Sequence, residues 1–132
     1  MISHELNSKI LSLAPRFTAN DYAPSTYAEL KSNNAAGLVV WSGESDNTIY
    51  GCNRVNHAFR AWHDSLHLKL GVNFDYAGEL AVGLEQARLI KNDALGLIIM
   101  GEVVGQVEYL NKYGHFPIDQ VEFMRNYLKG II

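Results

Sequence analysis

The chain has a single cysteine, Cys52, and therefore cannot form an intrachain disulfide. Its first residues have neither the basic head nor the apolar core of a signal peptide. No apolar run reaches the roughly 18 to 20 residues that span a bilayer, and the longest covers only residues 94–101. These absences predict a cytoplasmic protein without a membrane partner.

An excess of positive charge is also missing. Eleven Lys and Arg face fourteen Asp and Glu, giving a net charge of −3. Proteins that bind the phosphate backbone of DNA or RNA normally present a basic surface, so nucleic acid is not an expected partner. The 132 residues, 48% of them hydrophobic and 19% charged, suffice for one folded domain over residues 1–132.

The spacing of apolar residues predicts a mainly α fold, α+β at most, in the form of a compact antiparallel helical bundle with a short N-terminal β element. The β element is expected to be a strand at 37–41, which could pair with 48–50 across a turn at 43–47. Asp75 and Asp93 are expected N-caps, and Gly71 and Gly114 mark helix ends. Helices are expected at 5–14, 25–31, 53–70, 76–91, 94–112 and 117–129.

Two histidines lie on the apolar face of the expected helix 53–70. His63 and His67 are four residues apart, a spacing that lets two imidazoles bind one cation. If the chain folds back around Asn73, His67 lies level with Glu79, and His63 lies one turn further along. The sequence therefore predicts a divalent metal, zinc or iron, held by two histidines and one carboxylate.

The same comparison of register places Glu102 and Gln106, on the expected helix 94–112, close to Glu79. Burial of an unpaired carboxylate is costly, so Glu102 requires a partner or a raised pKa. Three roles are open for Glu102: a fourth or second-metal ligand, a general base, or an acceptor for a histidine N–H. Asp64 is the other expected base, and Gln86 and Gln106 are expected to support the ligands through hydrogen bonds.

Two readings of these residues remain open. The histidines, Glu79, Glu102 and Gln106 could instead form a satisfied hydrogen-bonded network that only stabilises the fold. Asp64 also has the spacing of a surface ion pair with Arg60. Cys52 has no neighbouring histidine or basic residue to activate it, so it is not an expected nucleophile.

Two short motifs resemble metal-dependent hydrolases. Residues 63–67, HDSLH, resemble the HExxH helix of zincin metallopeptidases, and Glu79 resembles the third ligand of their glutamate-type subgroup. Asp64 then stands where that family has its glutamate base. The resemblance implies activation of water by zinc. The Trp62-His63-Asp64 segment also resembles the doublet of HD-type phosphohydrolases, in which adjacent histidine and aspartate bind metal.

A longer resemblance, over the C-terminal two thirds of the chain, is to small proteins encoded by tailed phages. It is carried by residues 56–64, His67, Phe74, 78–79, Gln86, 102–106, 116–117 and Gln120. It implies a viral protein that acts in a bacterial host and implies no reaction.

Together these patterns predict a metal-dependent hydrolase-like protein acting on a small-molecule or peptide-like substrate. The alternative is a non-enzymatic phage accessory or host-interaction protein. The sequence is compatible with a homo-oligomer.

Overall fold

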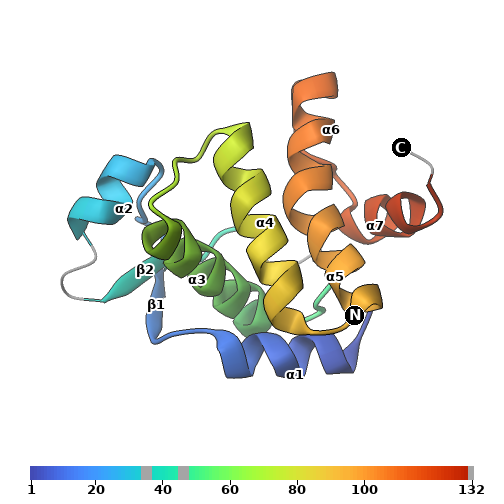
Figure 1. Cartoon of the computed structure of the whole chain (residues 1–132), viewed down its shortest axis with the longest axis horizontal. Helices are drawn as coiled ribbons and strands as arrows, with labels where there is room; N and C mark the ends of the chain where they lie inside the picture. Colours follow the sequence, from blue (N-terminus) through green and yellow to red (C-terminus); the bar gives the residue numbers. More distant parts are fainter. Residues whose placement is uncertain (34–36, 45–47, 131–132) are drawn as a thin grey trace.

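The computed structural model describes residues 1–33, 37–44 and 48–130. α3 packs against α1, α4 and a small two-stranded sheet, and α5 to α7 lie on the far side of α4 (Figure 1). The mainly α architecture with a small β element is confirmed. The elements are α1 (His4–Leu13), β1 (Phe17–Asn20), α2 (Tyr27–Asn33), β2 (Leu38–Trp41), α3 (Asn53–Leu70), α4 (Tyr76–Ile90), α5 (Asp93–Met100), the π-helical segment η1 (Gly101–Gly105), α6 (Gln106–Tyr113) and α7 (Gln120–Leu128). None of the helices among the described residues is long and apolar enough to cross a membrane.

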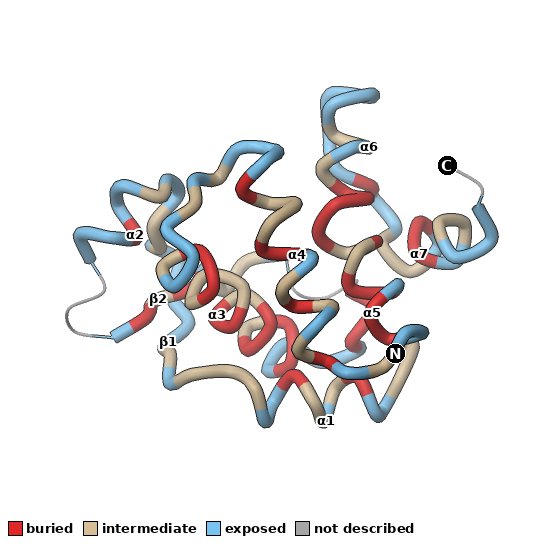
Figure 2. The backbone as a smooth tube through the Cα atoms, viewed as in Figure 1, coloured by how far each residue is buried: buried red, intermediate tan, exposed pale blue. Residues whose placement is uncertain are grey.

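The core lies between α3 and the helices on either side of it. The helical repeat brings Phe59, Trp62 and Leu66 to one face of α3, where all three are buried. That face packs against α1 and α4, and Figure 2 shows buried stretches along the inner sides of these helices. The site residues of α3 and α4 therefore lie on a packed scaffold rather than on loops.

The β element differs from the predicted hairpin. β2 pairs in parallel with β1, Phe17 opposite Leu38, and residues 48–50 form a turn instead of a strand. Instead of pairing with β2, the Ile49 carbonyl accepts a hydrogen bond from the Ile2 amide at 2.8 Å. Ile49 and Tyr50 enter the core as buried side chains. The centre of the predicted turn, 45–47, lies outside the described residues.

The helices begin and end near the predicted residues, except that α5 has a different N-cap and α7 begins later. Asp75 caps α4 through the amide of Gly78, as predicted. Asn92, rather than Asp93, caps α5 by accepting from the Leu95 amide at 3.0 Å. α7 begins at Gln120 instead of at 117, because Asp119 provides its N-cap.

The expected helix 94–112 contains a turn of π-helix, η1, between α5 and α6. The amide of Gln106 reaches back five residues to the carbonyl of Gly101. Gly101 and Gly105 face α7 closely, since a Cβ at either position would lie within 3.0 Å of the Tyr127 ring. This wider turn carries Glu102, and π turns of this kind are frequent at functional sites.

Candidate metal centre

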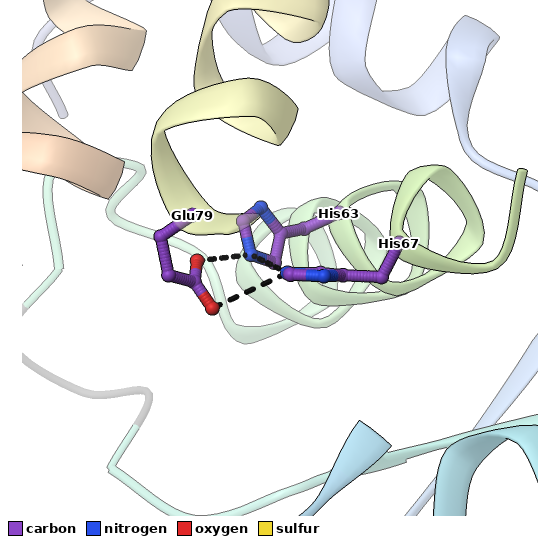
Figure 3. A group of neighbouring side chains, drawn as sticks. All are labelled: His63, His67 and Glu79. Carbon is purple, nitrogen blue, oxygen red and sulfur yellow. Dashed lines mark hydrogen bonds and ion pairs between the residues drawn. The ribbon is translucent and has the colours of Figure 1, made fainter. Parts of the chain in front are cut away.

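Three ligand-type side chains from α3 and α4 converge on one point (Figure 3). One candidate ligand atom from each of His63, His67 and Glu79 lies within 4.8 Å of the other two. Nε2 of His63 is 2.8 Å from one carboxylate oxygen of Glu79, and Nε2 of His67 is 3.2 Å from the other. The two Nε2 atoms are 3.2 Å apart. The group could therefore hold a metal ion, as the register of the two helices predicts.

The other nitrogen of each imidazole faces a hydrogen-bond acceptor. Nδ1 of His63 lies 2.9 Å from Oε1 of Gln86, and Nδ1 of His67 lies 3.0 Å from the backbone carbonyl of Val72. A carbonyl oxygen only accepts, so the Nδ1 atoms carry the protons and donate them. Each neutral imidazole then points its Nε2 lone pair at Glu79, which is the form that binds a metal.

The three converging atoms require a positive charge between them. Two Nε2 lone pairs and a carboxylate repel one another at these distances, unless a proton or a cation is shared. Burial lowers the pKa of His63, but the hydrogen bond and the charge of Glu79 outweigh it and raise that pKa above the ordinary value. Burial raises the pKa of Glu79, and its hydrogen bonds with His63 and His67 bring it down to about 2.

The group of His63, His67 and Glu79 is called the metal group below, because it could hold a metal ion. It is buried on one side and partly exposed on the other. His67 is fully buried, whereas the side chains of His63 and Glu79 are 16% and 17% exposed. His63 and Glu79 line a cleft of about 360 Å³, together with Asp64 and Glu102. A ligand in this cleft would therefore reach the metal group from one side only.

Glu102 and Gln106 line the same cleft from η1 and α6. Nε2 of Gln106 donates to a carboxylate oxygen of Glu102 at 3.0 Å. Burial raises the pKa of Glu102 to about 7, although Arg60, Gln106 and the Tyr50 hydroxyl act to lower it. Among the described residues, Glu102 is not one of the converging ligand atoms, which leaves it free to act as a base.

Asp64 lies next to His63 in sequence and also faces the cleft. Burial raises the pKa of its carboxyl group to about 6, against the lowering effect of the two histidines. Within the described part of the chain, its carboxylate does not join the metal group. Asp64 and Glu102 thus both line the cleft that His63 and Glu79 also line.

Arg60 also lines the cleft, which its spacing from Asp64 did not indicate. The ion pair with Asp64 that this spacing allowed is not formed, and no carboxylate of the described residues lies within 4 Å of the guanidinium. The guanidinium donates instead to the carbonyls of Trp41, Gly43 and Glu44. The backbone carbonyls that hold Arg60 and His67 have no signature in the sequence, because any residue type supplies them.

Comparisons with protein-family models, with curated proteins and with solved structures found no match for this chain.

Proposed function

We propose that this protein is a metal-dependent hydrolase in which His63, His67 and Glu79 hold one divalent ion, zinc or iron. The observation that carries the proposal is the orientation of the two imidazoles. Acceptors at both Nδ1 atoms turn both Nε2 atoms toward the Glu79 carboxylate. Two histidines and one carboxylate leave coordination positions for water and substrate, which is the ligand set of many catalytic zinc and iron sites.

The cleft supplies the remaining parts of a hydrolytic site. A divalent cation at the ligands would lower the pKa of a water molecule and polarise a substrate carbonyl. Glu102, with a pKa of about 7, can take the proton of the attacking water and return it to the leaving group. Asp64 lies in the same cleft and is the second candidate for this proton transfer.

The cleft volume of about 360 Å³ suits a small-molecule or peptide-like substrate. The resemblance of residues 56–64 and 102–106 to tailed-phage proteins supports the cytoplasm of a bacterial host as the place of action.

Metal content tests the proposal. Protein purified without a polyhistidine tag should contain nearly one equivalent of a transition metal by elemental analysis. We expect His63→Ala, His67→Ala and Glu79→Ala to lose that metal. The control is His115→Ala, because His115 is exposed on the connection to α7. A folded wild-type protein that contains no metal and takes up none would contradict the proposal.

A structural role is the second candidate function, that of a non-enzymatic accessory or host-interaction protein. It is favoured by the contacts of 2.8 Å and 3.2 Å, because a proton on each Nε2 would make both of them hydrogen bonds to Glu79 without a metal. Asp64→Asn and Glu102→Gln distinguish the two. In the hydrolase, at least one of them gives a folded, metal-loaded protein without turnover. In the structural protein, every loss of biological effect accompanies a loss of stability.

A further inference from the structure

Arg60 lies on the same side of α3 as His63, three residues away, and both line the cleft. Three residues of α-helix correspond to a rise of about 4.5 Å, so the backbone positions of Arg60 and His63 lie roughly one turn apart. A substrate bound in this cleft therefore has a positive charge on the same wall as the candidate ligand His63.

The guanidinium is held by backbone carbonyls, and no carboxylate of the described residues forms an ion pair with it. Its Nη1 donates to the carbonyls of Trp41 and Gly43, the second at 2.7 Å, and Nη2 donates to the Glu44 carbonyl at 3.4 Å. The cation also lies over the Trp41 ring, 5.4 Å from its centroid. Burial lowers the pKa of Arg60, an effect that nearby carboxylates beyond hydrogen-bonding distance oppose.

These contacts leave part of the guanidinium available to a ligand. Among the described residues, Nε has no hydrogen-bond acceptor, and Nη2 makes only the one long bond to Glu44. The Nε and Nη2 edge of a guanidinium is planar and pairs with both oxygens of a carboxylate at once. A half-buried cation without an ion pair gains most from a ligand that supplies the missing negative charge.

The other residues of the cleft decide which anion fits. Three carboxyl side chains, those of Asp64, Glu79 and Glu102, line it beside the single guanidinium. A single carboxylate matches one guanidinium in charge and shape, because its two oxygens can accept from Nε and Nη2 together. The aromatic rings of Trp41, Phe59 and Phe116 line the remainder and suit an apolar group on the ligand.

We infer that the substrate is a monocarboxylate with an apolar group, such as a peptide with a free C-terminus, and that Arg60 binds its carboxylate. This inference rests on the proposed hydrolase, because it assigns the substrate class of the same cleft. In that reaction, water oxygen bonds to the carbonyl carbon of the scissile amide, the C–N bond breaks, and the amine leaves with the proton that Glu102 or Asp64 returns. Arg60 is then a substrate-binding residue that determines specificity.

A matched pair of ligands tests the inference by binding alone. N-acetyl-Gly-Phe, with its free carboxylate, and N-acetyl-Gly-Phe-amide are titrated calorimetrically into the zinc-loaded full chain. We expect the acid to bind about tenfold more tightly than the amide, the gain typical of a charge-assisted pair. Arg60→Gln should remove this preference, and Arg54→Gln, an exposed arginine of the same helix, should keep it.

Each other outcome is decisive as well. Equal affinities for acid and amide in the wild type, or no binding of either, would overturn the inference even if Arg60→Gln fails to fold. Tighter binding of phenyl phosphate than of the acid would also overturn it, in favour of a phosphate ligand. An acid preference that persists while no amide is ever hydrolysed would leave the carboxylate site intact and remove the hydrolase.

Discussion

The carboxyl group of Glu102 is held in its protonated form by burial, which raises its pKa to about 7 from the ordinary 4.5. The folded chain therefore binds this proton more tightly than the unfolded chain does. The stability gained is fully present below pH 4.5 and is lost as the pH rises through about 7. The same property that suits Glu102 to proton transfer thus costs stability at neutral and alkaline pH.

Glu102→Gln should remove that cost, because an amide can still accept from Gln106 but cannot ionise. We expect its free energy of unfolding to match that of the wild type near pH 4 and to exceed it by about 1 to 3 kcal/mol at pH 8, since one pKa unit corresponds to about 1.4 kcal/mol. Urea denaturation in the presence of a chelator at several pH values measures this. Parallel pH profiles for the two proteins would show that Glu102 ionises freely in the fold.

The hydrogen bond between Gln86 and His63 should determine how tightly zinc binds. Gln86 is fully buried and its Oε1 accepts from Nδ1 of His63 at 2.9 Å. Gln86→Leu removes this acceptor and keeps the side-chain size, so the imidazole is no longer held in its metal-binding form. We expect zinc affinity to fall about 10- to 100-fold, as for other partners of metal-bound histidines. Competition with a zinc-binding dye measures the change.

Gln106→Leu is the matched control for that variant. Gln106 is also a buried glutamine, but it donates to Glu102 and contacts no metal ligand among the hydrogen bonds of the described residues. Its zinc affinity should stay close to that of the wild type. Equal losses of zinc affinity in the two variants would mean that any buried glutamine near the site matters for metal binding, and not the orientation of His63.

At the scale of the helices, the first turn of α4 determines where Glu79 lies. Gly78 is buried there, and a Cβ at this position would collide with the carbonyl oxygen of Asn73. Gly78→Ala should therefore displace the turn, lower stability by about 1 to 3 kcal/mol and weaken zinc binding. Thermal unfolding and zinc titration of the same samples measure both effects.

Gly96→Ala serves as the comparison for the glycine variant. A Cβ at Gly96 would make ordinary contacts of 3.5 Å with Ala87, and alanine favours the helix by about 1 kcal/mol over glycine. This variant should be as stable as the wild type or more stable, with unchanged zinc affinity. A Gly78→Ala protein that behaves in the same way would show that the turn can adjust without moving Glu79.

The sequence predicted those parts of the fold that depend on local patterns. The helical period located α3 and α4, and their antiparallel packing then placed His67 opposite Glu79, as the distance of 3.2 Å confirms. β1 was not predicted because it is only four residues long and only Phe17 among them is partly buried, which is too little for a strand pattern. The π turn at η1 escaped as well, because it depends on how Gly101 and Gly105 pack against Tyr127.

The whole molecule brings α3 and α4 together around the metal group, and this couples the group to the stability of the fold. Neither helix alone supplies all three candidate ligands, which come from α3 and α4. Sites of this kind are rarely preformed in an unfolded chain. A ligand that binds only the folded state stabilises it by mass action. Metal binding should therefore raise the melting temperature of the entire domain, instead of stabilising one helix.

With zinc at about 100 times its dissociation constant, we expect a gain of about 2.7 kcal/mol, which corresponds to a rise of roughly 10 °C in melting temperature. Chelation should reverse the rise. His63→Ala should make the melting temperature independent of zinc, whereas His115→Ala should retain the dependence, because its histidine lies outside the metal group. Calorimetric scans with zinc and with chelator test all three proteins. A rise of equal size in His63→Ala would place the stabilising zinc elsewhere on the chain, and the two-histidine, one-carboxylate centre would then have to be given up.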